Sequence, residues 1–594
     1  MSSTPPSSSS ASPSPAPARP PRVRRLPLAG VLRPVKPSDI WFKPAGSVVV
    51  ATAIPNLTLL ALGRLDLVMY TMAGTFCALY AHNLPYAARA RALAWVVAGM
   101  TASIAVALVT ASLTGSAVIL VAVGALLAAA QKTLCDATRI GPPGHLIFTF
   151  ISSASLFAPQ SLGQVPGHLA LTLAGGAVAW LVGMAPALVR PHGPERRATA
   201  RALHAAAAYA DTARADASAA GASDAGASDA GASRAAAERA RAAAAAAVHA
   251  AWQSLLATGT RGAAARRALA RLVVRAEEAL AAPGAADPAA LRAWAAGLRG
   301  TGAVPRPGDV RPEEADELLG VEAELAAPKV SLWRRVGPGS PLLPVGLRTA
   351  VGCALAGYGS LALGIGRPYW ALVTAASLYQ ANVTLTWNRG VQRVVGNLVG
   401  VLAFAAIAPF AHLGHAELIV SCLVLAFGAE ALITRNYWLG SVCVTPMALL
   451  VTEFARFQQP GELILERVVD TLVGAVLGIV AAVLVTNRRA ADHIERAIVA
   501  TDRAREQAEA GLAGAGAVEP ARRRLTAALV DLRASADAAA GEWWQRALPE
   551  QRVVDAERAG HRTLAATVRR RSGENGQGTR PRAGAADAWE GARA

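Results

Sequence analysis

The sequence predicts an all-α polytopic membrane protein, and three observations support this. Hydrophobic residues make up 53% of the 594 residues and charged residues only 16%, a more apolar composition than soluble domains have. Apolar runs near the roughly 20 residues of one helical crossing fall into two groups around a polar middle region. The two groups also share motifs at a constant separation. We therefore expect two parallel six-helix transmembrane repeats, about 12 spans in all, with a cytoplasmic helical insert and a C-terminal helical region.

Changes in composition divide the chain into six segments. They are a basic Pro/Ser-rich arm (1–43), a first transmembrane block (44–189), a helical insert (190–343), a second transmembrane block (344–487), a helical region (488–570) and a polar tail (571–594). We expect the arm and the tail to be disordered. The arm contains no apolar stretch long enough for a signal-peptide core, so we expect it to remain in the cytoplasm.

Each block contains six apolar runs bounded by polar residues, Pro or Gly. In the first block they are 47–63, 67–84, 92–112, 114–130, 145–158 and 168–189. In the second block they are 344–364, 369–385, 394–411, 416–434, 437–454 and 467–486. The run 145–158 is short, and the sequence does not decide whether it crosses the membrane fully.

Matching motifs indicate an internal repeat. Asn83 and Asn382 lie 299 positions apart, as do Gly175 and Gly474, and neighbouring residues match at the same offset. A shared offset at both ends of the blocks is the signature of duplication. Because each block has an even number of runs, both halves enter and leave on the same side of the membrane, which makes the repeat parallel.

Charge placement predicts orientation in the cell membrane. The predicted inner loops carry more Lys and Arg than the outer loops, for example Arg389 and Arg435 against Arg64. This bias places both termini in the cytoplasm. The formal net charge of +18 is spread over several segments, which disfavours nucleic acid as a partner and favours contact with the anionic surface of a lipid bilayer.

The polar regions predict further cytoplasmic helices. In the insert they are 196–216, 232–257 and 262–282, and after the second block they are 490–511, 519–540 and 550–570. A Gly-, Ala-, Ser- and Asp-rich segment, 221–231, predicts a flexible loop between two of the insert helices.

Motifs of soluble enzymes do not occur in the sequence. It contains no phosphate-binding loop, no His-Glu-x-x-His zinc motif and no paired cysteines with metal spacing. We therefore expect a chain that is not an enzyme, that takes no cofactor or metal, and that does not by itself use ATP to drive transport.

The second block carries the most informative motifs. They are Tyr369-Trp370-Ala371-x-x-Thr374, Asn388-Arg389-x-x-x-Arg393-x-x-Gly396-x-x-x-Gly400, Arg435-Asn436-Tyr437, Thr445-Pro446 and Arg467-x-x-Asp470-x-x-x-Gly474. With these motifs the chain resembles the fusaric-acid-resistance (FUSC) family of the aromatic acid exporter superfamily, which also resembles the plant aluminium-activated malate transporters. The resemblance implies an integral membrane transporter that exports carboxylates, either coupled to protons or passively.

Two departures from the family pattern stand out. Asn397 occupies a position where the family usually has Thr, and the first block has His168 and Leu171 where the second has Arg467 and Asp470. Function is therefore expected to be divided unequally between the halves.

Candidate substrate-binding residues follow from the chemistry of anions. Arg389 and Arg393 are four apart and share one helix face, and guanidinium groups bind carboxylates through a planar fork. They form either an anion-attracting ring at the cytoplasmic mouth or ordinary positive-inside anchors. Thr374, Tyr379 and Asn382 are polar groups expected to line the path.

Arg467 and Asp470 are candidates for gating or coupling. Three positions apart near an outer helix start, they form either an ion pair in a gate or an interfacial salt bridge.

Three functional hypotheses remain at this stage. The first is an exporter of aromatic or other small organic carboxylates, the second an anion channel, and the third a non-transporting scaffold whose cytoplasmic helices bind a partner. Homo-oligomers are compatible with each. The sequence fixes neither the substrate nor the coupling ion.

Overall fold

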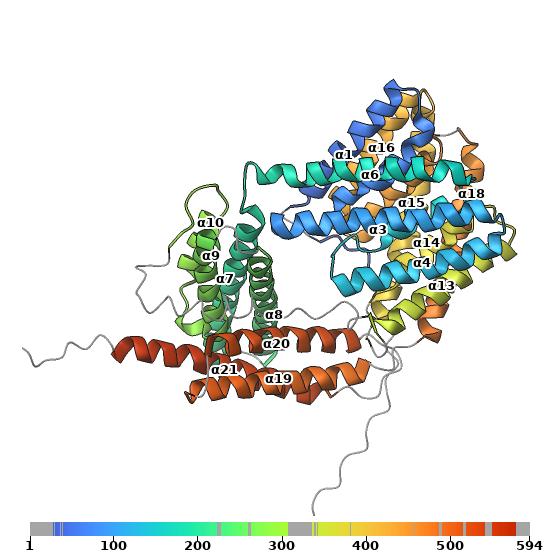
Figure 1. Cartoon of the computed structure of the whole chain (residues 1–594). Coiled ribbons are helices and arrows are strands. Elements are labelled where there is room, and N and C mark those ends of the chain that lie inside the picture. The colour runs from blue at the N-terminus through green and yellow to red at the C-terminus, as the bar shows by residue number, and fades with distance from the viewer. Residues whose placement is uncertain are drawn as a thin grey trace, which may run out of the picture.

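Helices make up all of the regular structure in the described part of the chain (Figure 1). The computed structural model describes residues 28, 30–35, 37, 40–221, 227–258, 263–306, 336–337, 340, 342–380, 382–454, 457–485, 490–514, 518–540 and 549–577. Most of the predicted arm and the end of the predicted tail lie outside these residues.

Apolar helices form one body, on the right of Figure 1. From the first block they are α1 (Phe42–Ala61), α2 (Val68–Thr75) flanked by 3-10 turns η1 (Leu65–Leu67) and η2 (Phe76–Leu79), α3 (Tyr86–Leu113), α4 (Ala117–Thr138), α5 (Leu146–Leu156) and α6 (Val165–Met184), with turns η3 (Leu162–Gln164) and η4 (Ala185–Ala187) at its ends. From the second block they are α13 (Leu343–Ala362), α14 (Tyr369–Leu378), α15 (Val383–Ala411), α16 (His415–Ile433), α17 (Tyr437–Val451) and α18 (Pro460–Leu484).

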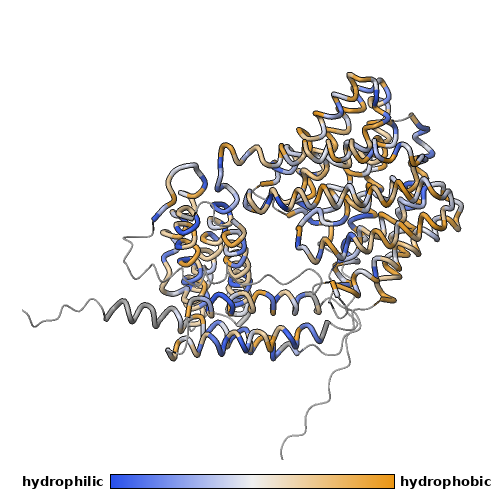
Figure 2. The backbone as a smooth tube through the Cα atoms, viewed as in Figure 1, coloured by the Kyte–Doolittle hydropathy of each residue, from blue (hydrophilic) through white to orange (hydrophobic). Residues whose placement is uncertain are grey.

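Hydrophobic residues predominate along the helices of this body, as Figure 2 shows, and many of their side chains are exposed. Large side chains such as Trp95, Leu126 and Leu402 are 77%, 66% and 71% exposed. Apolar patches of this extent on a monomer indicate contact with lipid. Seven described helices are long and apolar enough to cross a bilayer.

A helix lies at each of the twelve predicted runs, but four of these helices are short. In both blocks the second and fifth helices are the shortest, with 8 and 11 residues in α2 and α5 and 10 and 15 residues in α14 and α17. A complete crossing needs about 20 residues of helix. The helix lengths therefore establish multiple crossings but not twelve.

The two halves contact each other through corresponding helices. The first helix of each block packs against the fourth helix of the other, since α1 contacts α16 and α13 contacts α4. Within the blocks, α2 packs on α6 and α14 packs on α18. One continuous apolar core includes buried residues of both halves, such as Met72 and Phe404.

Glycine allows the closest of these helix crossings. A Cβ atom on Gly175 of α6 would lie 2.3 Å from the Thr71 carbonyl oxygen of α2, and a Cβ atom on Gly474 of α18 would lie 2.4 Å from the Ala371 carbonyl oxygen of α14. Real Cβ atoms do not approach backbone this closely. Small residues at these two positions therefore permit the backbones to touch.

The remaining helices form a separate layered body. Its insert helices are α7 (Gly193–Gly221), α8 (Ala227–Ala257), α9 (Ala263–Ala281) and α10 (Pro288–Gly297), with turn η5 (Pro283–Ala285). Its C-terminal helices are α19 (Ala490–Leu512), α20 (Val518–Ala540) and α21 (Glu550–Gln577). The two groups meet where α20 packs on α8 and α21 on α9 (Figure 1).

A buried ion pair joins these two groups. Arg522 of α20 lies 3.4 Å from the Glu277 carboxylate of α9, and both side chains are 1% exposed. The Thr526 hydroxyl donates a hydrogen bond to the same carboxylate. Removing one partner of such a pair destabilises the fold by more than the intact pair stabilises it, because the other charge would remain buried alone.

Three predicted boundaries were wrong. The segment predicted as a loop at 221–231 is helical from Ala227, and 222–226 lie outside the described residues. The tail predicted from 571 is helical through Gln577, because α21 continues. Part of the arm is ordered, since Val31 is buried and α1 begins at Phe42.

A glycine substitution tests the helix crossing. We expect Gly474→Val to lower stability by about 1–3 kcal/mol, because the added side chain must displace backbone. Gly461→Val is the control, since Gly461 lies in the same helix with nothing within 4 Å of its Cβ position. Melting temperatures in detergent measure both. Equal melting temperatures for the two variants would show that the crossing is not this close.

Candidate functional site

Three arginines gather inside the second half, and we call Arg389, Arg393 and Arg467 the arginine cluster. Arg389 and Arg393 lie on α15 and Arg467 lies on α18. Aromatic residues from α14 and α17 contact their guanidinium groups. The cluster therefore lies where four helices of the second half meet.

Tyr437, the first residue of α17, holds the two arginines of α15. The guanidinium carbon of Arg389 lies 3.9 Å from the centroid of the Tyr437 ring. Nη1 of Arg393 donates a hydrogen bond of 3.3 Å to the Tyr437 hydroxyl. The predicted shared face of Arg389 and Arg393 is confirmed, because one ring meets both side chains.

Arg467 is buried against Trp370. Its side chain is 1% exposed, and its guanidinium carbon lies 3.9 Å from the Trp370 ring centroid. The Nε and Nη1 atoms of Arg467 are buried and have no hydrogen-bond partner. Cation–π contact offsets part of the cost of desolvating the charge but does not satisfy these N–H donors.

Asp470 lies one turn beyond Arg467 without pairing with it. Its Oδ1 accepts a hydrogen bond of 2.6 Å from the Ser360 hydroxyl of α13, and its Oδ2 is buried without a partner. Both side chains are at most 1% exposed. The two side chains form no direct ion pair, because the Asp470 carboxylate is hydrogen-bonded to Ser360; their role in gating or coupling stays a prediction.

The charges of this region do not balance. Among the described residues, the three guanidinium groups form no ion pair with a carboxylate, and the Nε of Arg393 also lacks a hydrogen-bond partner. Buried cations are costly unless they are paired or hydrogen-bonded. A bound anion would supply the missing acceptor oxygens, since guanidinium groups bind carboxylates bidentately.

A hydrogen-bonded network fixes the helices around the cluster. Asn397 of α15 donates from Nδ2 to the Thr471 hydroxyl of α18 at 2.9 Å and accepts at Oδ1 from the Thr445 hydroxyl of α17 at 2.7 Å. Asn397 is 1% exposed. The departure from the family pattern at 397 therefore places an amide where it bridges three helices.

The other predicted path residues have structural partners. The Thr374 hydroxyl donates to the Trp370 carbonyl oxygen, and Asn382 caps α15 by accepting from the Leu385 N–H at 2.8 Å. The Tyr379 hydroxyl donates to the Gly478 carbonyl oxygen at 3.1 Å. Their lining of a path stays a prediction, since these three residues are not among the contacts of the arginine cluster.

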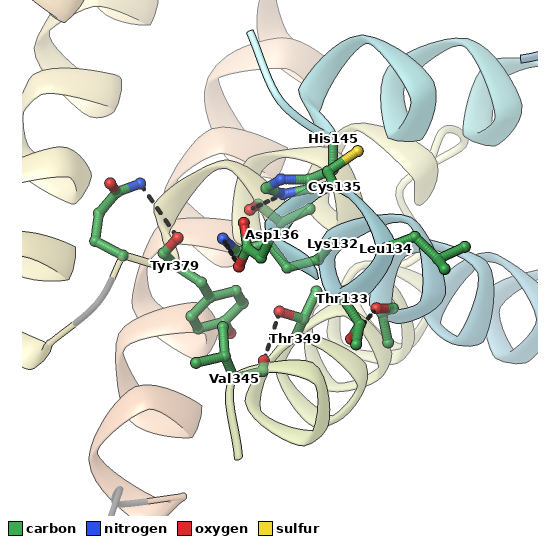
Figure 3. A network of polar contacts seen from close by, with 12 residues as sticks. Lys132, Thr133, Leu134, Cys135, Asp136, His145, Val345, Thr349 and Tyr379 are labelled. Atoms are coloured by element: carbon green, nitrogen blue, oxygen red, sulfur yellow. Dashed lines mark hydrogen bonds and ion pairs between the residues drawn. The ribbon is translucent and has the colours of Figure 1, made fainter. Parts of the chain in front are cut away.

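Polar contacts also join the two halves near Tyr379 (Figure 3). Lys132 pairs with Asp136 on α4 at 2.6 Å. The His145 ring, just before α5, lies 3.1 Å from the Ala376 carbonyl oxygen of α14. Lys132 therefore already has a carboxylate partner and adds no unpaired cation.

The N-terminal segment covers one end of α15 and α17. The Val31 carbonyl oxygen accepts from the side chains of Gln392 and Asn436, and the Leu32 carbonyl oxygen accepts from Trp438. Gln392 and Trp438 are sequence neighbours of Arg393 and Tyr437. This part of the arm is thus placed beside the cluster.

The first half has different chemistry at the corresponding position. His168 stacks on Tyr70 with ring centroids 3.7 Å apart, much as Arg467 lies on Trp370. Gln160 hydrogen-bonds both rings. No arginine occupies this position, so the two halves differ in charge at this helix crossing.

The sequence missed Tyr437 and Ser360 as functional partners. Tyr437 stood in a quoted motif, Arg435-Asn436-Tyr437, but nothing in the spacing linked it to α15. Ser360 carried no signal. Within the described part of the chain, no group of three His, Cys, Asp or Glu side chains is arranged to hold a metal ion.

These features define an all-helical membrane protein with a charged centre in its second half. Residues 353–481 match the family described as fusaric acid resistance protein-like. The matched region begins in α13 and ends in α18, so it contains the whole arginine cluster. This part of the chain is similar to the fusaric acid resistance-like family, as the sequence motifs predicted.

A curated protein gives a second comparison. The chain is 30% identical over 211 residues to "Uncharacterized membrane protein YvaC" of Bacillus subtilis (strain 168), a match that covers 34% of this chain and 32% of that protein. The match therefore spans less than a third of the length of the Bacillus subtilis protein. No solved structure matches significantly.

Substitution of Asn397 tests the network. We expect Asn397→Leu to lower stability by about 1–3 kcal/mol, because the buried Thr445 hydroxyl loses its acceptor. Leu402→Ala is the control, since Leu402 lies on the same helix and is 71% exposed. Thermal unfolding in detergent measures both. If Asn397→Leu melts no lower than the control, the network does not hold the helices together.

Proposed function

We propose that the chain is an integral membrane transporter that exports aromatic or other small organic carboxylates across the cytoplasmic membrane. The observation that carries the proposal is the arginine cluster, with buried N–H groups of Arg393 and Arg467 that have no acceptor. The fusaric acid resistance-like match over this same region supports a transporter. The match itself does not name the substrate.

Each residue of the cluster has a distinct proposed role. Arg389 and Arg393 attract the anion, and Tyr437 keeps their guanidinium groups in place. Arg467 completes the binding of the carboxylate, while Trp370 and the neighbouring Tyr369 offer rings against which an aromatic substrate stacks. Asp470, with Oδ2 unpartnered, is the group through which proton coupling acts.

The proposed architecture is two parallel six-helix repeats with about twelve crossings and both termini in the cytoplasm. The reciprocal packing of α1 on α16 and of α13 on α4 supports duplication. The short second and fifth helices of each block then complete their crossings with irregular backbone buried in protein, which membranes tolerate. The basic residues of the inner loops support this orientation.

A transport assay tests the function. Proteoliposomes containing the chain should move radiolabelled benzoate, and Arg393→Gln with Arg467→Gln should reduce that flux at least tenfold, because each guanidinium–carboxylate contact is strong. Arg435→Gln is the control, since Arg435 is an exposed arginine between α16 and α17. Chromatography and melting temperature verify that each variant folds.

The outcome also separates the alternatives. Flux that depends on a proton gradient supports an exporter. A macroscopic anion current supports a channel instead. Wild-type protein that moves no benzoate or related acid, with folding verified, would leave the scaffold hypothesis. Unchanged flux in the double variant would overturn the site.

Cysteine labelling tests the orientation. With the five native cysteines replaced, Gly163→Cys and Gly461→Cys should react with a membrane-impermeant maleimide in intact cells, while Gly300→Cys should react only after permeabilisation. All three glycines are exposed. Labelling of position 300 in intact cells would contradict cytoplasmic placement of the insert.

A further inference from the structure

The layered body formed by the insert helices and the C-terminal helices contains a cavity between the insert and the last helix, α21. Its volume is about 690 Å³, and its walls come from α7, α8, α9 and α21. Tyr209 of α7 and Arg241 of α8 face Arg558, His561 and Arg562 of α21 across it. The cavity is thus shared by two segments that are far apart in the sequence.

Positive charge dominates the walls. Arg558 and Arg562 are exposed side chains that form no ion pair with a described residue. Arg241 lies 4.0 Å from Glu557, whose carboxylate is also 3.7 Å from Arg533. Among the side chains that line the cavity, three arginines stand against one carboxylate, that of Asp555.

His561 adds a polar group with no partner. Its Nδ1 is buried and makes no hydrogen bond. Burial, with a smaller contribution from the charge of Arg241, lowers the pKa of His561 to about 3. The ring is therefore neutral at physiological pH and offers one hydrogen bond to a ligand without adding charge.

The cavity also has an apolar side. Leu280 and Ala281 at the end of α9 line it, together with the Tyr209 ring. The volume is much larger than an inorganic anion needs. Arginine side chains beside an apolar wall fit an anion with an apolar body better than they fit an inorganic anion, which has no apolar surface to bury.

We propose that this cavity is a binding site for a small organic carboxylate, held by Arg558 and Arg562 and packed against Leu280 and Tyr209. The site is separate from the arginine cluster and does not depend on transport. Its occupant binds the insert and the C-terminal helices at once. Binding therefore stabilises the contact of α21 with α9 and α8, which makes the cavity a sensor of cytoplasmic carboxylate.

Hydrogen–deuterium exchange on the full chain in nanodiscs tests the site. Benzoate should protect peptides of α21 and the end of α9, and the concentration for half-protection should rise roughly tenfold or more in Arg558→Ala with Arg562→Ala, because two charge-assisted contacts are lost. Arg496→Ala with Arg503→Ala is the matched control, since both residues are exposed on α19. Inorganic phosphate is the second probe.

The possible results are decisive. Protection of α21 by benzoate that is lost in the double variant and kept in the control supports the proposal. Protection by phosphate alone overturns the carboxylate assignment, and absence of protection in the wild-type chain overturns the site without reference to any variant. Peptides of α15 and α18 report binding at the arginine cluster in the same experiment. Absence of binding at one of the two proposed sites can therefore be distinguished from absence of binding at the other.

Discussion

The stacking of guanidinium groups on aromatic rings inside an apolar body is the interaction on which the second half depends. Arg467 lies on Trp370 and Arg389 lies on Tyr437, so helices α14, α15, α17 and α18 are joined through charge. Each contact lowers the cost of keeping a cation out of water but leaves N–H groups unsatisfied. A fold that keeps these guanidinium groups buried despite their unsatisfied N–H groups is suited to binding an anion there.

The rest of the fold provides the rigidity that such a site needs. Gly474 lets α18 touch α14, and Asn397 connects α15 with α17 and α18. These contacts fix the axes of the helices that carry the arginines. The first half has a comparable helix crossing at Gly175 but stacks a histidine where the second half stacks Arg467. The two halves therefore have similar helix packing but different side chains at this position.

The polar body formed by α7–α10 and α19–α21 is held by a different balance of forces. Its helices are polar outside and rich in Ala inside, and a buried pair, Arg522 and Glu277, joins insert to C-terminal region. Arg522 has a carboxylate partner, whereas the arginines of the cluster have none among the described residues.

The sequence by itself determined the helical class and the position of the apolar helices, and it predicted Arg389, Arg393, Arg467 and Asp470 as site residues. Hydrophobic runs and helical spacing act locally, so local pattern was enough. Only the tertiary structure decided the hydrogen-bond partners of these residues and the lengths of the helices. Ser360 lies 110 positions from its partner Asp470, and Tyr437 lies 44 positions from its partner Arg393. Short helices such as α14 end where packing allows, and burial decides which charges meet, because both depend on neighbours that are distant in the chain.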